Sequence, residues 1–283
     1  MQTILVAVDP QHDAGQVLAR AAQLSAQHGA AVTVQYVVED IDVGEQDVQR
    51  SIDQHARATL EGLVKAAGFA TTPSLKVEFG VPHRCVNTIA RELAADIILI
   101  GPGHPSTVMQ RVFGSTADRI VRTSSIPVLI VRNKSAQAYR SVAVAMDFSP
   151  LSEAALQAAR TLAPDARIDL VHAYEVPLPF EQAMLRAGTP PDDAERFRQT
   201  KINDCRRQLA DFARKRATGA DAVVLRGAPG TALVELSRSG RVDVIALGTQ
   251  GRNAAAQALL GSVARRLLSE AGCDLLVAGR ARE

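Results

Sequence analysis

The stretch that decides the fold is Gly248–Ser262, which reads GTQGRNAAAQALLGS. It follows an apolar run typical of a buried strand, Val242–Leu247, and leads into a helical pattern over Leu260–Ala271. Glycines adopt backbone conformations closed to other residues and leave room for a bound group, and the N–H groups at a helix start attract anions. A glycine-spaced loop between a strand and a helix therefore predicts a phosphate-binding site.

A loop of the same kind occurs earlier in the chain. Asp96–Gly101 (DIILIG) recurs as Asp243–Gly248 (DVIALG), and the pair Gly114-Ser115 recurs as Gly261-Ser262 at the same separation along the chain. The opening VAVDP also recurs, as AVAMDFSP. The sequence is therefore a tandem duplication.

Strand and helix patterns alternate through both copies, each in the order β-α-β-α-β-α-β-α-β. The segment between the second strand and the long helix of the second copy is Pro-rich, and we interpret it as an excursion from the repeat. The expected strands are 3–8, 31–38, 75–79, 96–100, 127–131, 141–146, 167–174, 222–225, 242–247 and 274–278, and the expected helices are 13–28, 45–67, 82–94, 112–123, 150–162, 192–216, 230–239 and 260–271.

This alternation predicts the fold class α/β, with two tandem doubly wound domains. Each would be a five-stranded, mainly parallel sheet with helices on both faces, and ligands would bind outside the carboxyl ends of the strands where the strand order reverses. We place the domains at residues 1–133 and 141–283, joined by a polar linker, 134–140. These are called the first half and the second half below.

The last strand of each half is apolar and would be exposed at a sheet edge: Val128–Val131 and Leu275–Ala278. Either the two halves pair through these strands, or each strand is covered by its own terminal segment.

The spacing G-x-x-G, nine residues, G-S, placed between the fourth strand and fourth helix, resembles the ATP-binding signature of the universal stress protein family. Other positions match as well: Asp147 ends the first strand of the second half, Gly227-Ala-Pro229 precedes its third helix, and Asp243 starts its fourth strand. The resemblance covers nearly the whole chain as two consecutive copies. It implies the Rossmann-like universal stress fold and edge-to-edge association of domains, so that the tandem would imitate a homodimer and could dimerise again.

The resemblance also implies ATP, with or without Mg²⁺, as the bound cofactor. Asp147 would lie at the adenosine end, Ala173 would face the base, and glycines would let the backbone approach the phosphates. Arg252 is added on physical grounds, since a guanidinium binds phosphate well. The nucleotide-binding residues expected in the second half are Asp147, Ala173, Leu247, Gly248, Gly251, Arg252, Gly261, Ser262 and Val263.

The first half departs from this pattern. Its middle glycine is replaced by His104, and Pro102 and Pro105 each remove an N–H donor from the loop. We therefore expect the second half to be the main nucleotide site and the first to be a partner, a degenerate site or a platform. The corresponding residues of the first half are Asp9, Val37, Gly101, His104, Gly114 and Ser115.

Two simpler interpretations stay open. Asp147 can cap the following helix together with Ser149, and the pair Gly261-Ser262 can be a helix start and nothing more.

The sequence contains no GxxxxGK[ST] loop, no GxGxxG after the first strand, and no paired histidines or cysteines at metal-ligand spacing. We predict no catalytic residue and no metal site. The leading hypothesis is a stress-response or regulatory protein that binds ATP and hydrolyses it slowly at most. The alternatives are a nucleotide-free interaction module and, from a related architecture, an adenylyl transferase or ATP pyrophosphatase, whose motifs are missing after Asp9 and Asp147.

Composition agrees with a globular protein: 47% of residues are hydrophobic, 22% are charged, and the net charge is +2. This charge favours neither nucleic acid nor a membrane surface as a partner, and no apolar run reaches membrane-spanning length. The opening MQTILVAVDP is typical of a strand rather than a signal peptide. Three dispersed cysteines indicate a reducing, cytoplasmic environment.

Overall fold

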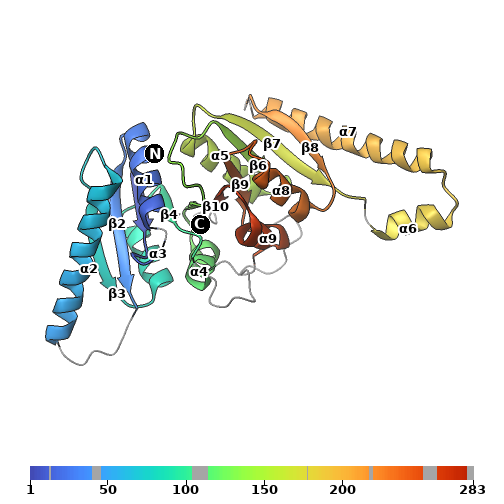
Figure 1. Cartoon of the computed structure of the whole chain (residues 1–283). Coiled ribbons are helices and arrows are strands. Elements are labelled where there is room, and N and C mark those ends of the chain that lie inside the picture. The colour runs from blue at the N-terminus through green and yellow to red at the C-terminus, as the bar shows by residue number, and fades with distance from the viewer. Residues whose placement is uncertain are drawn as a thin grey trace.

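The computed structural model describes residues 1–12, 14–39, 46–103, 114–176, 178–216, 219–250 and 260–278. Its strands form one ten-stranded sheet in the order β3-β2-β1-β4-β5-β10-β9-β6-β7-β8. Figure 1 shows the two halves side by side. In each half, the other strands lie on both sides of the first strand, β1 or β6. The fold is therefore the doubly wound α/β class that the sequence predicts.

The first half alternates strands and helices in the expected order, with the ends of elements shifted by a few residues. Its helix α4 begins directly after a glycine, and the predicted start of this helix at Val112 lies outside the described residues. The elements are β1 (Thr3–Ala7), α1 (Ala14–His28), β2 (Ala31–Val38), α2 (Gln46–Ala67), β3 (Ser74–Phe79), α3 (Pro82–Glu92), β4 (Ile97–Ile100), α4 (Ser115–Thr123) and β5 (Val128–Ile130).

The second half repeats this order and adds one helix, α6. Within each half, every pair of neighbouring strands is parallel. The elements are β6 (Ser141–Ala145), α5 (Pro150–Leu162), β7 (Arg167–Tyr174), α6 (Leu178–Arg186), α7 (Pro191–Lys215), β8 (Asp221–Arg226), α8 (Pro229–Arg238), β9 (Val244–Gly248), α9 (Ser262–Glu270) and β10 (Asp274–Ala278).

Alternation of side chains along the strands builds one core on each face of the sheet. Ile4 and Val6 belong to the core covered by α1, α2, α5 and α7, whereas Leu5 belongs to the core covered by α3, α4, α8 and α9. Both cores run through the two halves without interruption, because the strands at the centre of the sheet contribute buried residues to each of them.

The two halves meet at the centre of the sheet, where β5 and β10 pair antiparallel. Leu275 lies opposite Ile130, and Val277 lies opposite Val128. All four of these residues are fully or almost fully buried. Neither strand is therefore an exposed edge.

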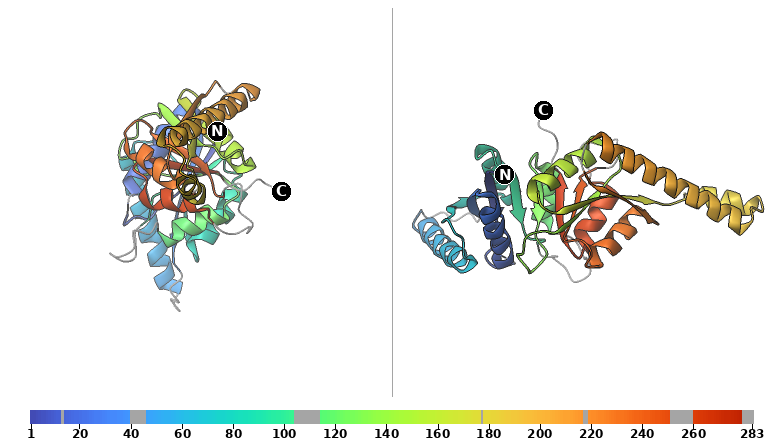
Figure 2. Two further views of the ribbon diagram at one scale, coloured as in Figure 1. Left: turned by 90° about the vertical axis from the view of Figure 1, so that its right-hand side faces the viewer. Right: turned by 90° about the horizontal axis from the view of Figure 1, so that it is seen from above.

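The elements expected from the sequence assign no helix within the Pro-rich excursion of the second half, and the structure contains one there. Leu178–Arg186 forms helix α6, because Pro179 falls in its first turn, where the missing N–H costs no intrahelical hydrogen bond. Pro191 is likewise the first residue of α7. Figures 1 and 2 show α7 extending beyond the sheet, with α6 packed at its far end.

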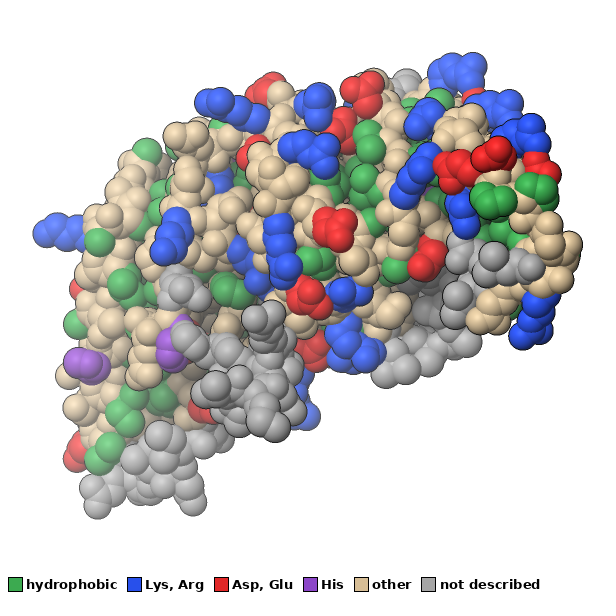
Figure 3. All heavy atoms as spheres, turned by 45° about the vertical axis from the view of Figure 1, so that its right-hand side comes forward, with side chains coloured by type: hydrophobic (Ala, Val, Ile, Leu, Met, Phe, Trp, Pro, Cys, Tyr) green, Lys and Arg blue, Asp and Glu red, His purple; other side chains and the backbone are tan. Residues whose placement is uncertain are grey.

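The surface of this extension carries charges of both signs. Arg207 pairs with Asp204 and Arg214 pairs with Asp211, each one helical turn apart on α7. Figure 3 shows basic side chains interspersed with acidic ones here rather than gathered into a single stripe. Exposed pairs of this kind contribute little to stability. In the described part of the chain, no helix is both long and apolar enough to cross a membrane.

Candidate functional site

Each half has a cavity at the carboxyl ends of its strands, at the point where the strand order reverses. In the first half this point lies between β1 and β4, and in the second half it lies between β6 and β9. The cavities measure about 520 Å³ and about 370 Å³, respectively. These are the positions at which doubly wound sheets bind ligands.

The second-half cavity gathers the described residues that the sequence singled out. They come from four separate segments: the end of β6, the end of β7, the end of β9 and the start of α9. Gly251 and Arg252 were also expected here, and both lie outside the described residues. The expected residues that line the cavity are Asp147, Ala173, Leu247, Gly248, Gly261, Ser262 and Val263.

Asp147 organises the turn between β6 and α5. Its Oδ1 accepts hydrogen bonds from the backbone N–H of Ser149 at 3.0 Å and from the Ser149 hydroxyl at 2.6 Å. Ser149 Oγ in turn accepts the N–H of Ser152 at 3.2 Å and so caps α5. The capping interpretation of Asp147 and Ser149 is therefore correct, and it leaves Asp147 on the cavity wall.

The same turn holds Phe148 in a left-handed backbone conformation, with a φ of 63° that non-glycine residues seldom adopt. The Phe148 ring lies 5.8 Å from the His172 ring and 6.2 Å from the Phe212 ring. The Nδ1 atom of His172 is 2.7 Å from the carbonyl oxygen of Met146. His172 is thus held by packing and a backbone contact, as expected for a structural histidine.

Gly248 has a packing reason to be glycine. A Cβ atom at this position would lie 2.7 Å from the Cβ of Leu151 and 3.1 Å from its carbonyl carbon. Helix α5 therefore packs directly against the end of β9. The sequence analysis attributed this glycine to approach by phosphate, but the contact with α5 alone excludes a larger residue.

The start of α9 faces the cavity with its backbone donors. The N–H of Gly261 is bonded to the carbonyl of Thr249 at 2.9 Å, and the first hydrogen bond within the helix runs from Arg265 N–H to Gly261. The N–H groups of Ser262, Val263 and Ala264 precede that bond, and the N-cap residue, Gly261, provides no side-chain cap. The helix dipole adds positive potential at this end.

Several lining residues were not among the site residues expected from the sequence. His172 and Val171 come from β7, Pro229 and Leu233 come from α8, and Thr249 lies in the glycine loop. Pro229 and Leu233 could have been suggested by the Gly-Ala-Pro match, since it places the start of α8 beside the site. His172 and Val171 depend on which face of β7 the fold turns toward the cavity.

The first-half cavity is built on the same frame. Five expected residues line it: Asp9, Val37, Gly101, Gly114 and Ser115. The sixth, His104, lies outside the described residues.

The loop of the first half closes as its counterpart does, through a bond from Gly114 N–H to the carbonyl of Pro102 at 3.2 Å. Gly103 adopts a φ of 71°, and a Cβ there would lie 3.0 Å from the Cα of Gly114. Gly103 is therefore required for the close approach of the two ends of this loop.

Polar side chains are more numerous in the first-half cavity. Asp9 accepts the N–H of Gln11 at 3.0 Å, and its other oxygen lies 2.8 Å from His12 Nδ1. Burial, together with the Asp9 and Glu39 carboxylates, raises the pKa of Tyr36, which keeps its hydroxyl protonated. The sequence analysis missed Gln11, His12, Gln35, Tyr36 and Glu39 as lining residues.

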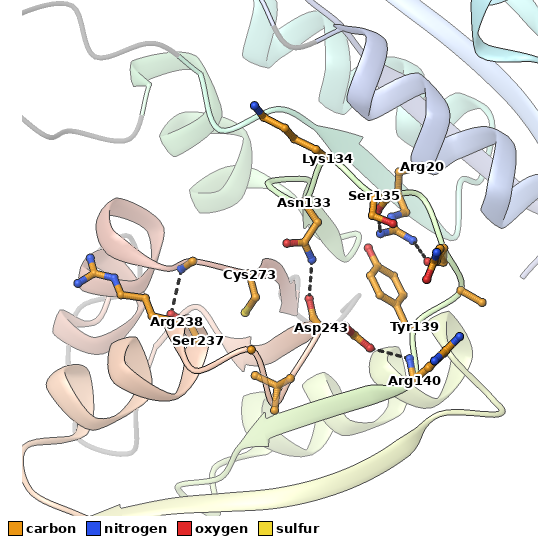
Figure 4. A pocket seen from close by; sticks show the side chains of 15 residues that line it. Arg20, Asn133, Lys134, Ser135, Tyr139, Arg140, Ser237, Arg238, Asp243 and Cys273 are labelled. Carbon is orange, nitrogen blue, oxygen red and sulfur yellow. Dashed lines mark hydrogen bonds between the residues drawn. The ribbon is translucent and has the colours of Figure 1, made fainter.

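A third cavity, of about 530 Å³, lies at the opposite edge, beside the amino ends of the central strands. Figure 4 shows the Asn133 side chain pointing toward Asp243 and the backbone of Arg140 lying beside the Asp243 carboxylate. The Asn133 amide donates to the Asp243 carbonyl at 3.1 Å, and the Arg140 N–H donates to the Asp243 carboxylate at 2.7 Å. These bonds hold residues 133–140 against the second half.

Cys273 lies in the wall of this third cavity, and burial raises its pKa to about 12, so that it stays a thiol. Cys85, Cys205 and Cys273 are all unpaired. Over the residues that the structure describes, no cluster of three or more His, Cys, Asp or Glu side chains could hold a metal ion.

Comparison with known proteins agrees with this architecture. The model of the universal stress protein family matches residues 1–132 and 138–279. A universal stress protein of Thermus aquaticus is 30% identical over 148 residues, which is 49% of this chain and 98% of that protein. A putative universal stress protein of Staphylococcus haemolyticus is 27% identical over 142 residues, which is 47% of this chain and 86% of that protein.

Among solved structures, a universal stress protein from Archaeoglobus fulgidus is similar over the full length. It has a TM-score of 0.69 and 16% sequence identity, and the match covers 99% of this chain and 96% of that chain. A putative universal stress protein from Pseudomonas aeruginosa has a TM-score of 0.64 at 15% identity. Two consecutive matches to one family model, covering most of the sequence, show that this chain belongs to the universal stress protein family.

Proposed function

We propose that the second half binds an adenine nucleotide, with ATP as its ligand, and that the chain acts as a nucleotide-binding stress-response or regulatory protein. The two domains of this proposal are residues 1–133 and 141–283, with 134–140 as the segment between them. Three unpaired cysteines support a reducing, cytoplasmic setting.

The observation that carries the proposal is the start of α9 at the cavity. Three successive N–H groups, those of Ser262, Val263 and Ala264, precede the first intrahelical bond and border the same cavity as Asp147 and Ala173. Phosphates bind well to such donors because the helix dipole favours negative charge there. The apolar wall formed by Val171, Leu233 and Leu247 suits a nucleobase.

The proposed pose follows from this division of the cavity. The base lies toward Ala173 and Leu247, the ribose lies toward Asp147, and the phosphates lie against the start of α9. Because the sequence contains no GxxxxGK[ST] loop, the proposal includes hydrolysis that is slow at most. Mg²⁺ would be held by the phosphates and water rather than by a protein cluster.

The test is calorimetric titration of ATP with Mg²⁺ into the wild type and two matched variants, Ser262→Asp and Ser115→Asp. Both serines are exposed first residues of a helix, where aspartate is compatible with folding. A carboxylate at position 262 would repel the phosphates and weaken ATP binding roughly tenfold or more. Ser115→Asp would leave ATP binding at the second half unchanged.

Equal ATP affinity in the two variants would contradict the assignment. Absence of ATP binding by the wild type would favour the nucleotide-free interaction module instead. Hydrolysis measured in the same samples, at a rate well above background, would favour the enzyme alternative.

A further inference from the structure

A groove of about 510 Å³ lies between α3 and the end of α4, and it is called the α3–α4 groove below. It shares no lining residue with the first-half cavity, which α3 contacts through Pro82 and Val86. The groove is lined by the adjacent face of the same helix and by residues 123–126, at the end of α4 and just after it. The residues of α3 that line it are His83, Arg84, Asn87, Thr88 and Arg91.

The wall of this groove is polar and positively charged. Hydroxyl and amide groups line it on both sides, and Arg84 and Arg91 add two guanidinium groups. Among the described residues of the wall there is no Asp or Glu, and Ile126 is the single apolar side chain. Guanidinium and hydroxyl groups donate hydrogen bonds, so this wall suits a polar anion rather than an apolar ligand.

Positive charge is concentrated at the start of α3. Burial, together with the charges of Arg119 and Arg84, lowers the pKa of His83, so both guanidinium groups lie close enough to disfavour its protonated form. The first turn of α3 contains no acidic residue, and the helix dipole adds positive potential there. In the described part of the chain, neither Arg84 nor Arg119 pairs with an acidic residue. An anion bound here would relieve this repulsion.

The second half allows a direct comparison of equivalent positions. Helix α8 begins at a proline as α3 does, and α9 begins at a serine as α4 does, with the same separation along the chain. The counterparts can therefore be read from the sequence. Two threonines of the groove are replaced by acids in the second half, and one arginine is replaced by threonine: Thr88 by Glu235, Thr123 by Glu270 and Arg84 by Thr231.

Glu270 balances the positive charges near it in the second half. Its carboxylate lies 3.3 Å from Nε of Arg266 and 3.9 Å from the guanidinium of Arg238. Its carbonyl oxygen also accepts a hydrogen bond from Nε of Arg238 at 3.1 Å. The counterpart of Arg266 in the first half is Arg119, where a threonine stands in place of the glutamate. The unbalanced charge is thus a feature of the α3–α4 groove rather than of the fold.

From these observations we infer that the α3–α4 groove binds a small polar molecule that carries a phosphate monoester group. The phosphate lies at the start of α3 beside His83 and Arg84, and the rest of the molecule lies along α3 toward Thr88 and Arg91. A volume of about 510 Å³ is in the usual range for a small-molecule site. The inference is independent of nucleotide binding in the second half, because the two sites share no residue.

The test is calorimetric titration of the full-length protein with three probes: glucose 6-phosphate, inorganic phosphate and glucose. The variant is Arg84→Thr, which reproduces the second-half residue at an exposed position. The matched control is Arg160→Thr, which removes the same charge from an exposed position on α5 in the second half. A second variant, Thr88→Glu, places a carboxylate beside the cations, as the second half does, and serves if Arg84→Thr does not fold.

The wild type should bind glucose 6-phosphate more tightly than inorganic phosphate, and glucose should not bind. Arg84→Thr should weaken binding of glucose 6-phosphate roughly tenfold, as expected for the loss of one charge-assisted hydrogen bond. Thr88→Glu should weaken it at least as much, because its carboxylate repels the phosphate. Arg160→Thr should bind as the wild type does, and added salt should weaken binding by the wild type.

Equal affinity for glucose 6-phosphate in the wild type and Arg84→Thr would overturn the inference. So would an equal loss in Arg84→Thr and Arg160→Thr, glucose binding as tight as that of glucose 6-phosphate, or absence of glucose 6-phosphate binding by the wild type at millimolar concentration. ATP titration of the same proteins keeps the two proposals apart, since Arg84→Thr should leave ATP binding at the second half unchanged.

Discussion

The two cavities of this chain have the same frame and different linings. In both halves a glycine N–H donates to a carbonyl just after the fourth strand, that of Pro102 or Thr249, and the next residue begins a helix whose first turn faces the cavity. The linings differ at equivalent positions of the two halves. Gln35 of the first half corresponds to Val171 of the second, and Pro102 corresponds to Thr249. The difference teaches that duplication kept the position of the cavity in both halves, while a few side chains of its wall differ.

The halves also differ where they meet. Asp274, at the start of β10, is completely buried and accepts hydrogen bonds from the N–H groups of Arg132 and Asn133 and from the Tyr139 hydroxyl. Arg20 from α1 of the first half approaches the same carboxylate at 3.6 Å and stacks on the Tyr139 ring. The counterpart of Asp274 in the first half is Pro127, so this junction has no mirror image.

The largest effect is expected from breaking this junction with Arg20→Leu. The substitution leaves the Asp274 carboxylate buried without its cation, and it removes hydrogen bonds to the carbonyls of Ser135 and Gln137. Losing one partner of a buried ion pair costs about 3–5 kcal/mol. Urea unfolding should show this loss, whereas Arg57→Leu, which breaks an exposed pair on α2, should change stability far less.

The pH dependence of Arg20→Leu follows from the same cluster. Burial raises the pKa of Asp274 above its ordinary 3.8, and Arg20 opposes that rise. Without Arg20 the pKa rises further, so the variant's deficit should be smallest below about pH 4, where the carboxyl is protonated in both states, and should grow as the pH rises through the folded-state pKa. A deficit that does not change with pH would contradict this account of the cluster.

A smaller loss is expected from Gly248→Ala, which tests whether the glycine at the end of β9 serves packing. The new Cβ would lie 2.7 Å from Leu151 Cβ, so that α5 must shift. Overpacking of this kind costs roughly 1–3 kcal/mol. The matched control is Gly15→Ala. Gly15 is the second residue of α1, the position that Leu151 occupies in α5, and a Cβ added at Gly15 has nothing within 4 Å.

The melting temperatures of the two glycine variants, measured without ligand, decide between packing and phosphate approach. If Gly248→Ala had the wild-type melting temperature but did not bind ATP, phosphate approach would be the better explanation for this glycine. In the second half, the residue that contacts this glycine is Leu151 of α5.

Much of the frame could be predicted from the sequence, because it depends on local patterns. The strand Ala31–Val38 and the helix Pro150–Leu162 have the bounds that their apolar periodicity and Pro150 indicate. Spaced glycines likewise placed α4 and α9 beside a cavity, since a strand, a glycine loop and a helix leave few arrangements. Helix α6 was not assigned from the sequence because its residues lie in the Pro-rich excursion, although Pro179 falls in its first turn.

The lining of the cavities was harder to predict, because it depends on contacts between segments distant in sequence. Gln35 interrupts an apolar strand, which is a visible signal, but only the fold shows that its amide is unpaired and that the residue lines the cavity. The packing role of Gly248 needed the position of Leu151, a residue almost a hundred positions earlier in the chain. The Arg20–Asp274 contact joins α1 to the last strand, and no local pattern indicates it.

The smallest expected effect is on stability in the pair Ser115→Asp and Ser262→Asp. Both helices begin without a side-chain cap, and both serines are exposed, so an aspartate should stabilise each helix start by about 0.3–1 kcal/mol through the helix dipole. Chemical unfolding without nucleotide should show similar gains for the two variants, and added salt should reduce both gains. Similar gains would show that the two helix starts are electrostatically equivalent, so that a loss of ATP binding confined to Ser262→Asp would come from the lining and the loop rather than from the helix. If instead only one variant gained stability, the starts of α4 and α9 would differ electrostatically, although the backbone around them is the same in the two halves.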